Sequence, residues 1–260
     1  MHALARKRYH KAAPLILVLT LLALLTGVGA VITSQSAEAT TASSSDIEEG
    51  QKLFTSNCAT CHGIDAQGQD GVAPSLVGVG AAAVDFQVGT GRMPMQASGA
   101  QAPAKEVVFT EEQIAQLAAY VASLGTGPSV PTAEQVDPEL GDAAKGMELF
   151  RTNCAMCHGS VGGGGALTQG KFAPSLMETT PTHIFEAMLT GPQSMPVFNN
   201  ANITEESKRD IIAYLVAQRD GSPGGLSFGS IGPVAEAFWA WIVGIGLLIA
   251  STIWIGARSS

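Results

Sequence analysis

Two long apolar runs lie near the two ends of the 260-residue chain. Residues 15–32 and residues 238–257 contain no charged side chain. At about 1.5 Å per residue, a helix of this length spans roughly the 30 Å hydrocarbon core of a bilayer. We therefore expect a transmembrane helix within residues 1–38 and another within residues 234–260. The first run could also belong to a signal peptide that is cleaved within 37–39, and the second could be a buried core helix.

Basic residues indicate which ends of these helices face the cytoplasm. Four basic side chains lie within residues 6–11, before the first run, and Arg258 follows the second. By the positive-inside rule both flanks are cytoplasmic. The chain is then expected in the cell membrane with its middle part on the extracytoplasmic side. Both termini are cytoplasmic if the N-terminal segment is retained.

The part of the chain between the two runs is an internal repeat. Its polar and apolar pattern at 49–57 recurs at 145–153. Further matches pair 73–76 with 173–176, 90–94 with 190–196, and a helix predicted from Thr110 with one predicted from Thr204. The repeat predicts two similar domains.

The expected domains are residues 39–127 and 141–222. Residues 128–140, with three prolines and three acids, form an exposed linker, and the Gly-, Ser- and Pro-rich residues 223–233 form a tether. Each domain has only about 80 residues, which is few for a domain with its own core. A large apolar cofactor would supply the missing volume.

Local signals place a helix at the start and at the end of each unit. Ser45 and Glu48 have the spacing of a capping box, and so do Thr110 and Gln113.

A glycine one turn before an aromatic residue lets a second helix cross closely. Gly50 and Phe54 have this spacing, and Tyr120 on the closing helix is the expected partner. The second unit has the same three positions at Gly146, Phe150 and Tyr214.

Composition narrows the class of protein. The chain is 46% hydrophobic and only 14% charged, whereas an ordinary soluble domain is about 25% charged. Acids outnumber bases 22 to 14, which gives a net charge of −8. Because a nucleic-acid-binding domain is basic, no nucleic acid is expected as a partner.

The four cysteines form the same motif in both units. Cys58, Cys61 and His62 have the pattern CxxCH, the attachment motif of a c-type haem. The equivalent residues of the second unit are Cys154, Cys157 and His158. Four thioether bonds would hold two haem c groups, and each histidine would bind an iron. The alternatives are disulfides or a zinc ribbon, whose cysteine pairs usually lie about 15–20 residues apart.

Methionine is the expected second axial ligand of each iron. Apart from the motif histidines, His183 is the remaining histidine after residue 38, and one residue cannot complete two irons. We expect it to be a structural or surface residue. Methionine can take this role, and Met93 and Met195, each followed by proline, occupy matching positions. Met95 is the alternative to Met93 as the second axial ligand of the first iron.

Pro74 and Pro174 follow the two motifs at similar distances. A carbonyl group there could accept a hydrogen bond from the second ring nitrogen of His62 or His158 and so orient the ring. A simple turn proline is an equally good interpretation.

With these motifs, nearly the whole chain resembles the dihaem cytochrome c subunit (cytochrome cc) of the actinobacterial quinol–cytochrome c reductase. The resemblance implies a mainly α fold, with two tandem class I cytochrome c domains and transmembrane helices at both ends. It implies cytochrome b and Rieske iron–sulfur subunits as partners, and a cytochrome c oxidase whose copper-site subunit accepts the electrons. The family's iron ligands correspond to His62 with Met93, and to His158 with Met195.

The expected function is one-electron relay in a respiratory chain, without substrate chemistry in this chain alone. A dihaem peroxidase would need an open iron position, which the two Met-Pro pairs do not favour. A dihaem subunit of another periplasmic dehydrogenase is the second alternative, and the C-terminal apolar run distinguishes this chain from soluble carriers.

Overall fold

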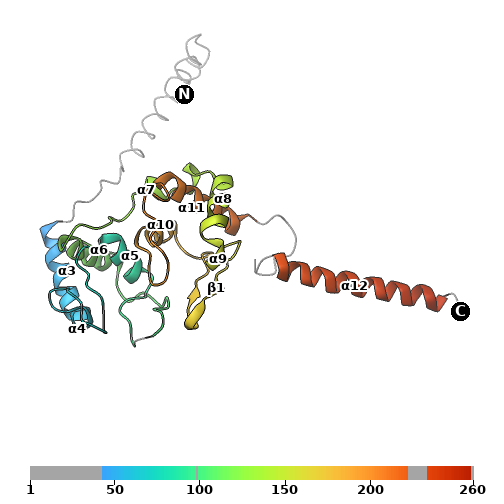
Figure 1. Cartoon of the computed structure of the whole chain (residues 1–260), viewed down its shortest axis with the longest axis horizontal. Helices are drawn as coiled ribbons and strands as arrows, with labels where there is room; N and C mark the ends of the chain where they lie inside the picture. Colours follow the sequence, from blue (N-terminus) through green and yellow to red (C-terminus); the bar gives the residue numbers. More distant parts are fainter. Residues whose placement is uncertain (1–42, 98, 222–232, 259–260) are drawn as a thin grey trace, which may run out of the picture. The chain divides into compact units, whose positions relative to one another are not determined.

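The computed structural model describes residues 43–97, 99–221 and 233–258. The expected N-terminal span and nearly all of the expected tether lie outside these ranges. Within the described ranges the chain is mainly helical, as predicted, with one pair of two-residue strands (Figure 1).

The first unit is built from helices that pack around one apolar core. Its helices are α3 (Ser44–Asn57), α4 (Ala59–His62), α5 (Ala81–Gly89) and α6 (Glu111–Ser123). The first and last of them, α3 and α6, pack against each other, and α5 packs against α6 (Figure 1). Core side chains between these helices include Phe54, Leu117, Tyr120 and Val121.

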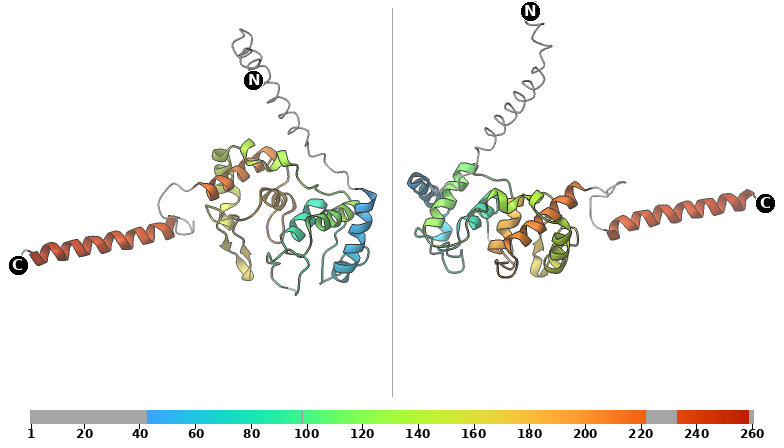
Figure 2. Two further views of the ribbon diagram at one scale, coloured as in Figure 1. Left: turned by 180° about the vertical axis from the view of Figure 1, so that it is seen from behind. Right: turned by 90° about the horizontal axis from the view of Figure 1, so that it is seen from above.

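The second unit repeats this arrangement. Its matching helices are α8 (Ala143–Asn153), α9 (Ala155–His158), α10 (Pro181–Thr190) and α11 (Glu205–Asp220). Helices α8 and α11 pack against each other as α3 and α6 do (Figure 2). Phe150, Phe185, Ile212 and Leu215 are among the residues of this second core.

Short elements fill the connections. The expected linker contains α7 (Ala133–Val136) and the 3-10 helix η1 (Pro138–Leu140), and both contact α11. In the second unit β1 (Gly165–Ala166) pairs antiparallel with β2 (Phe172–Ala173) around the 3-10 helix η2 (Thr168–Gly170). The linker is therefore partly packed on the second unit.

The predicted close helix crossing is confirmed in both units. The rings of Phe54 and Tyr120 lie 5.2 Å apart, and those of Phe150 and Tyr214 lie 5.4 Å apart. A Cβ atom at Gly50 would overlap the carbonyl group of Gln116. Glycine is therefore required where α3 crosses α6.

One predicted helix cap is correct and the other is wrong. Thr110 and Gln113 form the expected capping box at the start of α6. At the start of α3 the box is formed by Ser43 and Asp46 instead of Ser45 and Glu48. The cap therefore lies two residues earlier than predicted, because Ser43 and Asp46 have the same capping-box spacing as Ser45 and Glu48.

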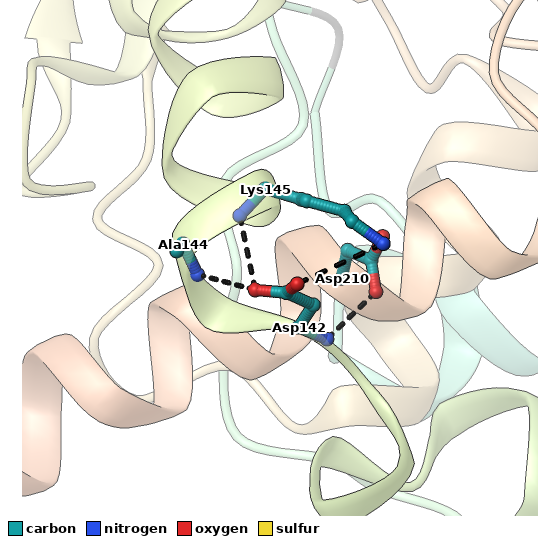
Figure 3. A network of polar contacts seen from close by, with 4 residues as sticks. All are labelled: Asp142, Ala144, Lys145 and Asp210. Atoms are coloured by element: carbon teal, nitrogen blue, oxygen red, sulfur yellow. Dashed lines mark hydrogen bonds and ion pairs between the residues drawn. The ribbon is translucent and has the colours of Figure 1, made fainter.

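A buried aspartate joins the start of α8 to α11 (Figure 3). Asp142 caps α8 by accepting hydrogen bonds from the N–H groups of Ala144 at 3.0 Å and Lys145 at 3.2 Å. The N–H of Asp142 itself donates to Asp210 Oδ1 at 2.7 Å. Because Asp210 belongs to α11, this contact fixes the position at which α8 begins.

The C-terminal apolar run forms α12 (Pro233–Arg258). Residues 237–258 are exposed along its length. Among the described residues, this is the one helix long and apolar enough to cross a membrane. The predicted C-terminal helix therefore exists in the structure, and the N-terminal one lies outside the described residues.

Candidate functional site

Each CxxCH motif lies where a long helix meets a one-turn helix. Cys58 ends α3 and begins α4, with φ −120° and ψ −31°. Its N–H donates to the carbonyl of Phe54 at 2.8 Å, and its own carbonyl accepts from the N–H of His62 at 3.0 Å. Gly63 ends the turn with a φ of 79°, a value that favours glycine. This junction brings Cys58, Cys61 and His62 together on one turn.

The second motif has the same geometry. Cys154 lies between α8 and α9 with φ −119° and ψ −34°. Its N–H donates to the carbonyl of Phe150 at 2.8 Å, and the N–H of His158 donates to its carbonyl at 2.9 Å. Gly159 ends the turn with a φ of 74°. The repeat in the sequence is therefore also a repeat in the local backbone.

The two motif histidines are buried and oriented. His62 Nδ1 lies 2.8 Å from the carbonyl oxygen of Pro74, and His158 Nδ1 lies 3.0 Å from that of Pro174. Both residues are 9% exposed. Because a carbonyl only accepts, Nδ1 carries the proton and Nε2 keeps its lone pair, the form that binds a metal. The orienting role of the two prolines is therefore confirmed.

The predicted methionines belong to the same cores as the motifs. Met93 packs against the first core together with Cys58, and Met195 packs against the second core, which includes Cys154. Met95, the competitor of Met93, is 36% exposed. The packing favours Met93 because an iron ligand must reach the interior of its domain.

The four cysteines are free thiols in the structure. Burial, followed by the charge of the neighbouring cysteine, raises the pKa of Cys58 and that of Cys154 to about 11. Each cysteine pair is followed by a buried histidine whose Nδ1 is held by a proline carbonyl and whose Nε2 is free to bind iron. The residues of each motif therefore fit covalent haem attachment better than a zinc site or a disulfide.

The two units are joined through the loops that carry the methionines. The side-chain amide of Gln101 pairs with the backbone of Phe172, with contacts of 2.8 and 2.9 Å. The amide of Gln193, two residues before Met195, pairs with the backbone of Ala102 at 2.9 and 3.5 Å. In each unit, one glutamine side chain thus hydrogen-bonds to the backbone of the other unit.

A cluster of ionisable residues beside this contact was only partly visible in the sequence. His183 was expected to be structural, and it is half-buried 3.8 Å from Asp85. Glu186 is fully buried one turn further along α10. No sequence motif includes these acids, because one comes from each unit and only the packing of α5 on α10 brings them together.

Comparisons with known proteins agree with two haem domains. The family model described as "Cytochrome c" matches residues 47–125. The family model described as "Cytochrome C oxidase, cbb3-type, subunit III" matches residues 141–215. Each match contains one CxxCH motif.

Full-length relatives share one description, "Cytochrome bc1 complex cytochrome c subunit". The protein of Mycobacterium tuberculosis (strain ATCC 25618 / H37Rv) is 45% identical, over 94% of this chain and 90% of its own length. The protein of Corynebacterium efficiens is 44% identical, over 90% of this chain and 86% of its own length. A "Cbb3-type cytochrome c oxidase subunit CcoP" from Rubrivivax gelatinosus is 33% identical over 50% of this chain and 40% of its own length.

The fold and the paired motifs define a dihaem c-type cytochrome, an electron-transfer protein with one covalent haem c in each of two domains. Within this class, the chain belongs to the family of the cytochrome bc1 complex cytochrome c subunits.

Proposed function

We propose that this chain is a membrane-anchored relay that carries single electrons from a cytochrome b and Rieske iron–sulfur complex to a terminal cytochrome c oxidase. The main support is the pair of matching sites, in which a buried histidine is oriented by a proline carbonyl in each of two packed domains. A bound haem c supplies reversible one-electron chemistry. The protein holds, orients and shields it.

Thioether bonds from Cys58 and Cys61 would hold one haem, and bonds from Cys154 and Cys157 the other. The axial ligands would be His62 with Met93, and His158 with Met195. The orientation of both histidines and the packing of both methionines support this assignment. A histidine–methionine pair raises the reduction potential, which suits a donor to an oxidase.

The contact between the units supports transfer within one chain. Gln101 and Gln193 lie in the segments after Met93 and before Met195, so they tie the two methionine segments to the opposite unit. A fixed contact of this kind would keep the two haem sites at a constant separation. An electron could then cross the protein without a diffusional step.

Anchoring would come from transmembrane helices at both ends. The exposed apolar face of α12 supports the C-terminal one, and the uncharged run 15–32 supports the N-terminal one. The positive-inside rule would then place the haem domains 39–127 and 141–222 outside the cytoplasm. The linker 128–140 and the tether 223–233 would join these parts.

Deletion of residues 234–260 tests the proposal. The truncated protein should be released from membranes with normal haem spectra and should no longer support quinol-dependent oxygen uptake. A control chain with an unrelated apolar helix of equal length in place of α12 should stay in the membrane. Full respiration with the truncated, soluble form would refute the anchored relay and favour a free dihaem carrier.

A further inference from the structure

Three potential metal ligands meet where the two units pack together. Asp85 lies on α5 of the first unit, and His183 and Glu186 lie one turn apart on α10 of the second. One ligand atom from each of the three lies within 4.8 Å of the other two. His183 Nε2 and Asp85 Oδ2 are 3.8 Å apart. The cluster is thus formed by both domains.

Glu186 has a buried carboxyl group that receives no hydrogen bond from a donor group among the described residues. The residue is 0% exposed. Burial, followed by the charge of Asp85 and a hydrogen bond between the two carboxyl groups, raises the pKa of Glu186 to about 10. A buried carboxylate without such a donor is costly, so this position requires either a proton or a cation.

The surroundings suit a divalent ion. Burial lowers the pKa of His183, although the Asp85 carboxylate raises it, so at neutral pH the imidazole is in its metal-binding form. Two carboxylates would carry two negative charges. The nearby Arg92, whose guanidinium lies over the Phe86 ring at 4.8 Å, offsets one of them. The group is then left with a net negative charge, which attracts a cation.

We propose that Asp85, His183 and Glu186 bind one divalent transition-metal ion, with zinc as the best fit, and that this ion bridges the two haem domains. Zinc combines imidazole and carboxylate ligands in three-residue sites whose fourth position is taken by water. In a zinc site with the usual bond lengths the ligand atoms are roughly 3.3 Å apart. The ligand atoms of Asp85, His183 and Glu186, now within 4.8 Å of one another, must therefore move slightly closer together. Gly89 leaves room beside the ring, since a Cβ there would lie 3.0 Å from His183 Nε2.

The position of the ion explains what it would do. Helix α5 ends at Gly89, just before Met93, and α10 ends at Thr190, just before Met195. An ion between these helices would hold the bases of both methionine segments. The expected effect is a stiffer contact between the haem domains.

Zinc binding to the full-length, haem-loaded protein in detergent tests the inference. The protein is treated with EDTA, desalted, exposed to zinc chloride and desalted again, and zinc per chain is measured by mass spectrometry. Competition with a chromophoric chelator gives the affinity. We expect one zinc per chain in the wild type. Because loss of an outer partner of a metal site costs about 10–100-fold, Glu186→Gln and His183→Asn should each weaken binding by at least about 100-fold.

Glu178→Gln is the matched control, since Glu178 is exposed and precedes α10. It should bind zinc like the wild type. The haem spectrum and the Tm in EDTA show that each variant is folded, and zinc should raise the Tm of the wild type but not that of the two ligand variants. The inference is overturned if the wild type retains no zinc, or if Glu186→Gln and His183→Asn retain it with unchanged affinity.

Discussion

Each motif histidine has one ring nitrogen engaged by the protein and one left to bind iron. The carbonyl groups of Pro74 and Pro174 accept from Nδ1 of His62 and His158. A hydrogen bond at this position fixes the ring and increases its basicity as a ligand. The two histidines are therefore equivalent by local geometry, and a difference between the haem potentials would have to arise elsewhere in each domain.

Replacing a methionine ligand should lower the potential of one haem at a time. Met195→His should keep its haem low-spin and lower its potential, because thioether is a poorer donor than imidazole to ferric iron. The same result is expected for Met93→His at the other haem. We expect a shift on the order of 0.1 V, since axial ligands span roughly 0.8 V. Spectroscopic redox titration of each variant measures it.

Met95→His is the control for the first domain. Because Met95 is 36% exposed, this change should leave both potentials close to those of the wild type. If Met95→His shifts the first potential and Met93→His does not, the ligand lies two residues further along the chain.

Glu186 should make the metal-free protein less stable as the pH rises. The pKa of Glu186 is raised to about 10 in the folded chain, from an ordinary value of 4.5. Between these values the unfolded chain has released this proton while the folded chain keeps it, so the free energy of unfolding falls as the pH increases. At pH 7 the loss exceeds about 1 kcal/mol, since one pKa unit corresponds to about 1.4 kcal/mol.

Glu186→Gln removes this titration. In EDTA the variant should have a higher Tm than the wild type at pH 7 and nearly the same Tm at pH 4, where the glutamate is protonated in both states. Thermal unfolding followed by circular dichroism measures both values. An equal change in Tm at the two pH values would contradict the assignment, since it would indicate a packing effect.

At the scale of single helices, the crossing of α3 and α6 depends on one missing side chain. Gly50→Ala would place a Cβ against the carbonyl of Gln116, and Gly146→Ala would place one against that of Asp210. Backbone atoms cannot move aside as a flexible side chain does. Each change should cost about 1–3 kcal/mol, the usual range for an overfilled core. Chemical denaturation of the haem-loaded variants measures the loss.

Gly246→Ala provides the comparison, since a Cβ at Gly246 on α12 would have no neighbour within 4 Å. Its free energy of unfolding should match that of the wild type. Equal stability of all three alanine variants would show that the helices separate easily, and the close crossing would not matter.

The helices and the motif residues could be predicted from sequence because their signals are local. Gly50 and Phe54 share one turn, and Cys58 and His62 share another. The start of α3 was misplaced because three consecutive serines allow two capping boxes, and the cap on Ser43 lengthens the helix. The burial of Glu186 could not be predicted from the sequence, because it depends on α5, a helix nearly one hundred residues away in the chain.

At the scale of the whole molecule, the two haem units differ in charge. Residues 46–127 contain nine acids and three bases, whereas residues 141–222 contain eight acids and six bases, and the linker adds three acids. Much of this charge is ordinary solvated surface. A freely diffusing carrier would still use such an asymmetry to reach its partner, because opposite charges steer encounter over a distance set by salt.

The salt dependence of respiration therefore separates a diffusing carrier from an anchored relay. For a diffusing carrier, the rate of oxygen uptake should fall steeply with ionic strength, since screening weakens steering beyond about 8–10 Å at 0.1–0.15 M salt. For the anchored relay, each electron passes within a standing complex and makes no encounter. We expect intact membranes to oxidise quinol without added cytochrome c, with a rate that changes less than about twofold between 20 and 200 mM salt. The matched control is a soluble cytochrome c added to the same oxidase, which should show the steep fall. A similar fall for the native membranes would contradict the relay and indicate a step of diffusional encounter between this protein and its acceptor.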